Sequence, residues 1–180
     1  MVLSYIFKTN GSFKDQVLYG RKGYIMMKQY AKRSYTMKAE KVAPGTKLYN
    51  YLEDCPYITS EAKCIKLTGT VNEVWPVTIE KLAKTYTFAD GTPITPDNIP
   101  EGEFSITTIV DDNAETIFAE QVSNQIQVVT SLGEVLTANR TGIPHGDGDF
   151  IVSAIMNGQP NPNDRWIVNG MVFTNTYREV

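Results

Sequence analysis

Two stretches of the chain, EVWPVTIEKLAKTY at residues 73–86 and DRWIVNGMVFTNTY at residues 164–177, carry nearly the same pattern. When they are aligned without a gap, a tryptophan, a valine, a threonine and a tyrosine coincide, and a leucine matches a phenylalanine. The matched pairs are Trp75/Trp166, Val77/Val168, Leu82/Phe173, Thr85/Thr176 and Tyr86/Tyr177, each separated by 91 residues. This regular spacing predicts an internal duplication.

The repeated stretch has the features of a strand followed by a short helix. Thr78 and Asn169 are good helix N-cap residues, because their side-chain oxygens can accept a hydrogen bond from an exposed backbone amide. After each cap, a large apolar residue and a tyrosine lie four positions apart, and such residues share one helical face. We therefore expect Trp75 and Trp166 to end strands, and a short helix to press on a small sheet in each copy.

A second repeated phrase appears earlier in each copy, as TMKAEKV at residues 36–42 and TIFAEQV at residues 116–122. Its offset is 80 residues, so the second copy has gained 11 residues between the two phrases. The turn-rich segments NRTGIPHGDGD at residues 139–149 and NGQPNPND at residues 157–164 are suited to such insertions. Alternating apolar residues around residue 37, and short β-branched runs bounded by turns, predict strands. Burial on both faces is expected only for the run DFIVSAI at residues 149–155.

These patterns predict an α+β, β-rich fold of two related small sheet units, each closed by a short C-terminal helix, arranged as a pseudo-dimer. The segment ADGTPITPDNIPEGE at residues 89–103 is rich in proline, glycine and acidic residues, and it is interpreted as a linker. The predicted organisation is an N-terminal basic extension at 1–33, a first repeat at 34–88, this linker at 89–103 and a second repeat at 104–180.

Composition places the chain among globular proteins, since 42% of its 180 residues are hydrophobic and 11% are aromatic. It has no apolar run near the ~20 residues that span a bilayer, and its N-terminal stretch lacks the pattern of a signal peptide. We expect a cytoplasmic protein that does not contact a membrane. Cys55 and Cys64 are read as free thiols, although a local disulfide stays open if the intervening residues turn back.

The second copy resembles a class of short phage and prophage accessory proteins without an assigned activity. Their pattern has an early V-x-A-x-Q, a V-x-T-x-x-G strand pair, a P-G-D-[YW]-I-V turn and a final F-x-x-T-Y-E. Gly148, Asp149 and Phe150 match the turn, and Phe173, Thr176 and Tyr177 match the ending, with Arg178 before Glu179 as a departure. The first copy is a more distant match. The resemblance implies a viral or prophage accessory protein, here duplicated in tandem, and it implies no catalytic residues.

Charge is distributed unevenly along the chain. Residues 1–50 carry ten Lys and Arg against two acidic residues, whereas residues 51–180 carry seven against eighteen. Basic groups that neutralise phosphate, interleaved with aromatic rings that stack, suit a nucleotide or nucleic acid. An ordinary buried strand flanked by solvated lysines would give the same pattern. The candidate binding residues are Arg21, Lys22, Tyr24, Lys28, Tyr30, Lys32 and Arg33.

Catalytic motifs are absent from the sequence. The segment PHGDGDF places His145, Asp147 and Asp149 at alternate positions, where metal ligation or acid–base chemistry is conceivable, but a tight turn also requires such residues. With one histidine and two cysteines, no structural zinc site is expected. We predict no catalytic residues, no metal and no cofactor.

The sequence favours a non-enzymatic phage-type accessory protein that binds a host protein or an anionic ligand, and such a protein could counteract host defence. A virion or other phage structural protein is the second hypothesis, because duplicated units can supply assembly contacts. A small enzyme is the third. The identity of the partner and the oligomeric state are left open.

Overall fold

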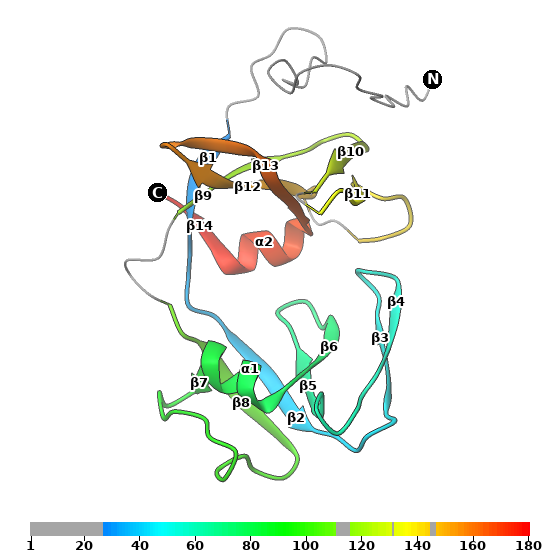
Figure 1. The fold of residues 1–180 in the computed structure, drawn as a ribbon, viewed down its shortest axis with the longest axis vertical. Coiled ribbons are helices and arrows are strands. Elements are labelled where there is room, and N and C mark those ends of the chain that lie inside the picture. Colours follow the sequence, from blue (N-terminus) through cyan, green and yellow to red (C-terminus); the bar gives the residue numbers. More distant parts are fainter. Residues whose placement is uncertain (1–26, 111–115, 131, 145–146) are drawn as a thin grey trace, which may run out of the picture.

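The computed structural model describes residues 27–110, 116–130, 132–144 and 147–180. This part of the chain is β-rich, with two short helices and several antiparallel sheets, which confirms the predicted class at that level. Its strands form two five-stranded sheets and two separate two-stranded hairpins (Figure 1). We call each large sheet, together with its helix and hairpin, a unit.

The first unit contains a sheet in the order β6-β5-β2-β8-β7, with all neighbouring strands antiparallel. Alternation explains its strands, since Met37 and Ala39 of β2 point into the core while their neighbours do not. The core is mainly aliphatic, and Ile65, Leu67 and Ile106 are fully buried in it. The elements are β2 (Thr36–Lys41), β3 (Lys47–Asn50), β4 (Cys55–Ile58), β5 (Ile65–Thr68), β6 (Val74–Val77), α1 (Ile79–Thr85), β7 (Tyr86–Phe88) and β8 (Glu103–Thr108).

The second unit has a sheet in the order β13-β12-β9-β1-β14, again antiparallel throughout. Strand β12 is buried on both faces, as predicted for DFIVSAI, because Phe150 and Val152 face one cluster and Ile151 faces another. The elements are β1 (Lys28–Lys32), β9 (Ile117–Gln121), β10 (Ile126–Val129), β11 (Val135–Ala138), β12 (Phe150–Met156), β13 (Gln159–Val168), α2 (Gly170–Thr176) and β14 (Tyr177–Glu179).

The two helices begin at the predicted caps. Thr78 Oγ1 accepts a hydrogen bond from Lys81 N at 3.0 Å, and Asn169 Oδ1 accepts one from Met171 N at 3.0 Å. Each helix buries one large residue, Leu82 in α1 and Phe173 in α2. Leu82 and Phe173 thus lie on the buried side of a short helix, as predicted. Tyr86 and Tyr177, predicted on the same helical faces, instead begin strands β7 and β14, because the helices end at Thr85 and Thr176.

The strand pairings of the two sheets match position by position. Leu67 is opposite Trp75 in the first sheet, and Val152 is opposite Trp166 in the second. The hydrogen bonds beside them also correspond: Val42 N donates to Cys64 O at 2.8 Å, and Val122 N donates to Asp149 O at 2.9 Å. Five of the extra residues of the second unit therefore lie between β9 and β12, and six lie in the longer β12–β13 hairpin.

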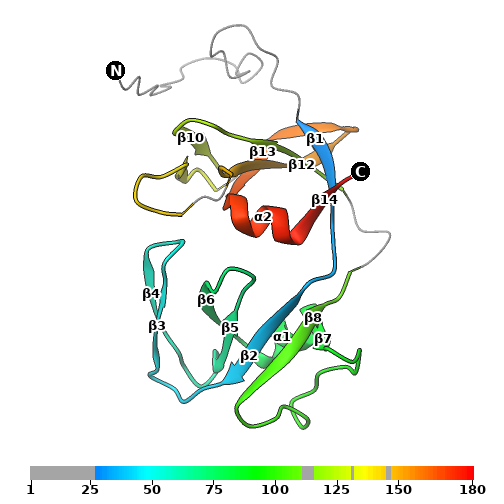
Figure 2. The ribbon, with the colours of Figure 1, turned by 180° about the vertical axis from the view of Figure 1, so that it is seen from behind.

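Two strands come from unexpected parts of the chain. Strand β1 lies in the segment predicted as an N-terminal extension, yet it pairs with β9 and β14 in the second sheet. Strand β8 begins at the last residue of the predicted linker and otherwise lies in the predicted second repeat, yet it pairs with β2 and β7 in the first sheet. Ile94, which lies within the predicted linker, is also buried in the first core. From β1 to β2 the chain runs from one unit to the other, as both views show (Figure 1, Figure 2).

Candidate functional site: a groove between the two units

A groove with a volume of about 450 Å³ lies between the units. Its first wall comes from the β3–β4 hairpin, the β5–β6 turn and β6. Its second wall comes from β11, the loop before β12, the end of β13 and α2. The lining residues on which the description below depends are Glu53, Tyr57, Glu73, Trp75, Arg140 and Asp149.

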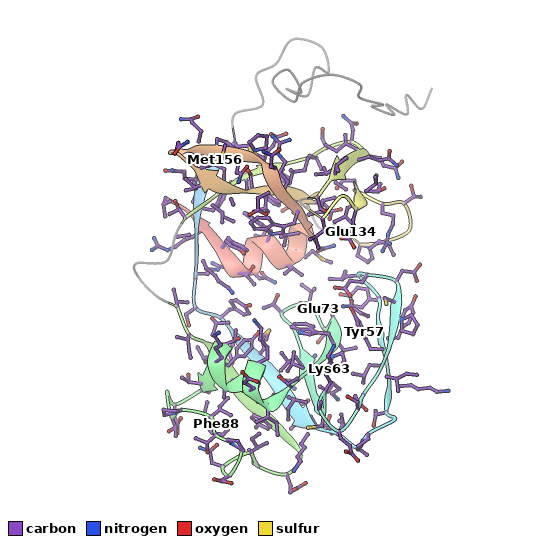
Figure 3. All side chains as sticks on the ribbon, in the orientation of Figure 1. Tyr57, Lys63, Glu73, Phe88, Glu134 and Met156 are labelled. Atoms are coloured by element: carbon purple, nitrogen blue, oxygen red, sulfur yellow. The ribbon has the colours of Figure 1, made fainter. Side chains whose placement is uncertain are left out.

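The first wall carries a tyrosine held by a carboxylate. Tyr57 and Glu73 lie on the side of the first unit that faces α2 (Figure 3). The Tyr57 hydroxyl donates a hydrogen bond to Glu53 Oε2, and this bond, followed by partial burial, raises the pKa of Tyr57 to about 12. Tyr57 therefore stays a neutral phenol at physiological pH and presents its ring and hydroxyl to the groove.

Glu73 lies on the turn between β5 and β6, where its carboxylate folds against Gly69. A Cβ atom on residue 69 would lie 2.0 Å from Glu73 Oε1, so any other residue there would force the Glu73 carboxylate to move. Glu73 Oε2 accepts a hydrogen bond from Val71 N at 3.0 Å. Burial outweighs this bond and raises the pKa of Glu73 above its ordinary value. The first wall thus contains a carboxylate that gains a proton more readily than a solvated one.

The second wall is organised by Asp149, which is 5% exposed. Asp149 Oδ2 accepts from Asn139 N at 2.6 Å, and Oδ1 accepts from Gly170 N at 3.3 Å at the start of α2. In return, Asp149 N donates to Asn139 Oδ1 at 2.7 Å. Asp149 therefore fixes the loop after β11 and the N-terminus of α2 relative to β12.

Gly148 precedes Asp149 for a steric reason. Its φ of +113° belongs to backbone that side chains rarely adopt, and a Cβ atom there would lie 2.5 Å from Val122 O. The Gly-Asp pair of this turn is thus explained by close approach to the end of β9 together with the hydrogen bonds of the aspartate.

Arg140 bridges the groove. One of its guanidinium nitrogens, Nη2, donates a hydrogen bond to Leu52 O of the first unit at 2.9 Å. Arg140 and Asp149 also make further interactions within the molecule. Since Asn139 is fixed by Asp149, the neighbouring Arg140 is held where it can reach across to the opposite wall.

The groove thus combines aromatic and aliphatic surface with several carboxylates and one guanidinium. Trp75 and Val172 supply apolar area, and Glu53 and Glu73 supply negative charge. Such a surface can bind a partner by apolar contact and by hydrogen bonds to basic or donor groups. Among the described residues, no group of three or more His, Cys, Asp and Glu side chains is arranged to hold a metal ion.

Of the groove residues named above, only Asp149 was a candidate from the sequence, as a conceivable metal-ligating or acid–base residue. Trp75 was assigned to the repeat, and Arg140 lies in a segment identified only as tolerant of insertion. A usable signal was the Gly148–Asp149 pair, because a buried turn aspartate next to a constrained glycine often fixes a loop. The relation between the β3–β4 hairpin and that loop depends on tertiary packing, which no local pattern records.

The structure separates the predicted binding residues. Tyr30 is half-buried and packs edge-on against Phe173 of the second core, with ring centroids 4.9 Å apart. Lys28 pairs with Glu179 at 2.9 Å, and Arg33 donates to the carbonyl oxygens of Asn175 at 2.8 Å and Thr174 at 2.6 Å. The Lys32 residue as a whole is exposed. Partial burial of its ammonium group, followed by the charge of Lys81, lowers the pKa of Lys32. Arg21, Lys22 and Tyr24 lie outside the described residues.

The other candidates from the sequence have separate positions. Asp149 has the structural role given above, Asp147 is exposed, and His145 lies outside the described residues. Cys55 and Cys64 are free thiols, the first half-buried and the second buried.

Comparison with known proteins gives no match: no protein family, no curated protein and no solved structure is significantly similar to this chain. Neither helix in the described ranges is long and apolar enough to cross a membrane.

Proposed function

We propose that the protein is a non-enzymatic, phage-type accessory protein that binds a host protein in the host cytoplasm through the groove between its units. The observation that carries the proposal is the groove itself, a space of about 450 Å³ with one wall from each unit. A site that needs both walls gives both halves of the chain a role in recognition.

In this proposal the units arose by tandem duplication and pack as a pseudo-dimer, with a helix closing each core. The equal strand orders and the matching registers at Trp75 and Trp166 support the duplication. The buried Leu82 and Phe173 support the role of the helices. Phage origin rests on the resemblance carried by the Gly148–Asp149 turn and by the ending around Tyr177.

The lining of the groove favours a partner segment that combines an apolar side chain with a basic one. Trp75 and Val172 offer apolar contact, while Glu53 and Glu73 place carboxylates beside it. A basic group that approaches these carboxylates gains charge-assisted hydrogen bonds, and the gain is larger when the contact excludes water. Partners with acidic segments would be repelled.

Capture from host lysate tests this proposal. Wild-type protein, Glu53→Lys and a control variant, Glu101→Lys, are immobilised, and co-purifying proteins are identified by mass spectrometry. Both replacements reverse one exposed charge, but only Glu53 lines the groove. We expect Glu53→Lys to lose a partner that the wild type and Glu101→Lys retain.

Titration of the identified partner into the same three proteins then gives affinities and their salt dependence. Equal affinity of Glu53→Lys and Glu101→Lys for every captured partner would contradict binding in the groove.

A second candidate, an anionic ligand at the basic segment, is favoured by one observation. The charges of Lys32 and Lys81 repel each other, and an anion bound between them would relieve that repulsion. Its test is binding of a labelled oligonucleotide to the wild type and to Lys32→Glu at several salt concentrations. Phosphate contacts would give a log–log salt slope of roughly 0.7–0.9 per phosphate, and the variant would bind more weakly.

A further inference from the structure

Strands β1 and β8 occupy equivalent places in the two sheets. Tyr30 of β1 lies opposite Ile117 of β9 and Glu179 of β14. Ile106 of β8 lies opposite Met37 of β2 and Phe88 of β7. Since β9 corresponds to β2 and β14 to β7, residue 30 corresponds to residue 106. Each strand precedes its own half of the chain but completes the sheet of the other half.

A local alternative exists for β1, because the chain could fold it back on β2. The register of this alternative can be read from β8, which pairs with β2 in the structure. There, Thr108 N donates a hydrogen bond to Tyr35 O at 3.1 Å. Lys32 has the same position in β1 that Thr108 has in β8. A β1–β2 hairpin in that register would leave Arg33 and Ser34 as a two-residue turn. Such turns need positive φ and favour Asn-Gly or glycine, so Arg-Ser is a poor sequence for one. A short connection that cannot turn easily promotes strand exchange.

Side-chain pairs at the sheet edges also distinguish the two arrangements. In the second sheet, Lys28 of β1 forms an ion pair with Glu179 of β14. At the corresponding place in the first sheet, Phe104 of β8 packs on Phe88 of β7, with ring centroids 5.7 Å apart. Folding β1 back on β2 would put Lys28 beside Phe88 and Phe104 beside Glu179. Both pairs would then be mismatched.

The residues of β1 and β8 that pack against the two cores are also poorly interchangeable. In the second unit, Tyr30 packs edge-on against the stacked rings of Phe150 and Phe173, at centroid distances of 6.1 Å and 4.9 Å. Ile106 is fully buried in the mainly aliphatic first core. Interchanging them would put a phenol where an isoleucine is enclosed, and overpacking of that kind destabilises a core.

We propose that β1 and β8 are exchanged between the two halves of a duplicated fold, and that the exchange holds the walls of the groove together. The connection between β1 and β2 is fixed to the second unit by Arg33, whose backbone N donates to Thr176 O at 3.0 Å. Without the exchange, β1 would leave the second unit, and the direct link from β1 to β2 would no longer join the two.

Paired cysteines distinguish the arrangements in the full-length protein. Thr36 and Thr107 are opposite each other in the structure, with their hydroxyl oxygens 3.3 Å apart. In the unexchanged arrangement, Ala31 would stand in place of Thr107. In a Cys55→Ser/Cys64→Ala background, we expect Thr36→Cys/Thr107→Cys to form a disulfide within one chain, and Ala31→Cys/Thr36→Cys to stay reduced. Peptide mapping under non-reducing conditions measures both.

The turn between β1 and β2 provides a matched pair of variants. Replacing Arg33 and Ser34 by Asn and Gly removes the Arg33 contacts and favours a hairpin, while replacing both by Ala removes the same contacts without favouring one. We expect the Asn-Gly variant to form several-fold more of the 31–36 disulfide than the Ala-Ala variant. Small-angle scattering of the 31–36 disulfide-linked protein should give a larger radius of gyration.

Three outcomes would overturn the proposal. The first is a 31–36 disulfide that forms as readily as the 36–107 disulfide in the otherwise native sequence. The second is a 36–107 disulfide that joins two chains, since the exchange proposed lies within one chain. The third is an equal yield of the 31–36 disulfide from the Asn-Gly and Ala-Ala variants, because the turn would then not select the arrangement.

Discussion

The two units share one backbone plan but fill it with different side chains. Where the second unit has the rings of Phe150, Phe173 and Tyr30, the first has Ile65, Leu82 and Ile106 at the corresponding positions. The registers are conserved although the side-chain volumes differ. Strand order and helix caps therefore define this fold, while each core is filled by its own set of side chains.

The largest expected effect is on the free energy of unfolding, and it compares the aromatic core of the second unit with the aliphatic core of the first. Phe173 is 1% exposed and stacks on Phe150 and Tyr177 at centroid distances of 3.8 Å and 4.7 Å. Phe173→Ala should lower the free energy of unfolding by about 3–5 kcal/mol, through lost burial and a cavity. Leu82→Ala is the matched variant in the first unit. Chemical denaturation measures both, and an unchanged midpoint for Phe173→Ala would show that its ring does not support the core.

A smaller effect is expected where the units differ in a turn. Asp149 accepts from two backbone amides, whereas Cys64 occupies the corresponding position in the first unit. Asp149→Ala should cost about 1–3 kcal/mol for each amide left without a partner. Cys64→Ala removes only a sulfur atom and should cost less. Equal losses in the two variants would contradict the role assigned to the aspartate.

The next effect depends on pH. Because burial raises the pKa of Glu73 in the folded protein, its charged form opposes folding. Stability associated with protonated Glu73 is fully present below the ordinary glutamate pKa of 4.5 and is lost as pH rises through the higher folded value. Glu73→Gln should therefore melt at a higher temperature than the wild type at neutral pH, and the two melting temperatures should converge toward pH 4. A difference independent of pH would contradict this explanation.

The smallest effect concerns the two edge pairs. The Lys28–Glu179 ion pair is exposed, so Lys28→Ala should change the melting temperature little, and less still at high salt. Phe104→Ala removes half-buried aromatic surface at the corresponding place and should lower the melting temperature more. The reverse ranking would mean that the ion pair stabilises the edge more than the aromatic pair does.

Local signals predicted the parts of the fold that depend on neighbouring residues. The caps at Thr78 and Asn169, the strand around Met37 and the two-sided burial of β12 all follow from periodicity and capping chemistry. Strands β1 and β8 escaped recognition as equivalents, because KQYAK and EFSITT share no pattern. Their pairing is set by partners far away in sequence.

The candidate site was less predictable than the fold. Interleaved lysines and tyrosines indicated a binding segment, but a sequence cannot tell a tyrosine that stacks on a ligand from one that packs on Phe173. Tyr30 does the latter. Arg140 and Leu52 meet only because the two units face each other, at a sequence separation of 88 residues.

The pairing of β1 has a consequence for synthesis on the ribosome. Lys28 is made before its partner Glu179, which follows 151 residues later. Strand β1 must therefore remain unpaired with its final neighbours until β9 and β14 have emerged from the ribosome, so the second sheet is completed late. Such long-range pairing slows folding and leaves an exposed strand edge in the nascent chain, where chaperones would act.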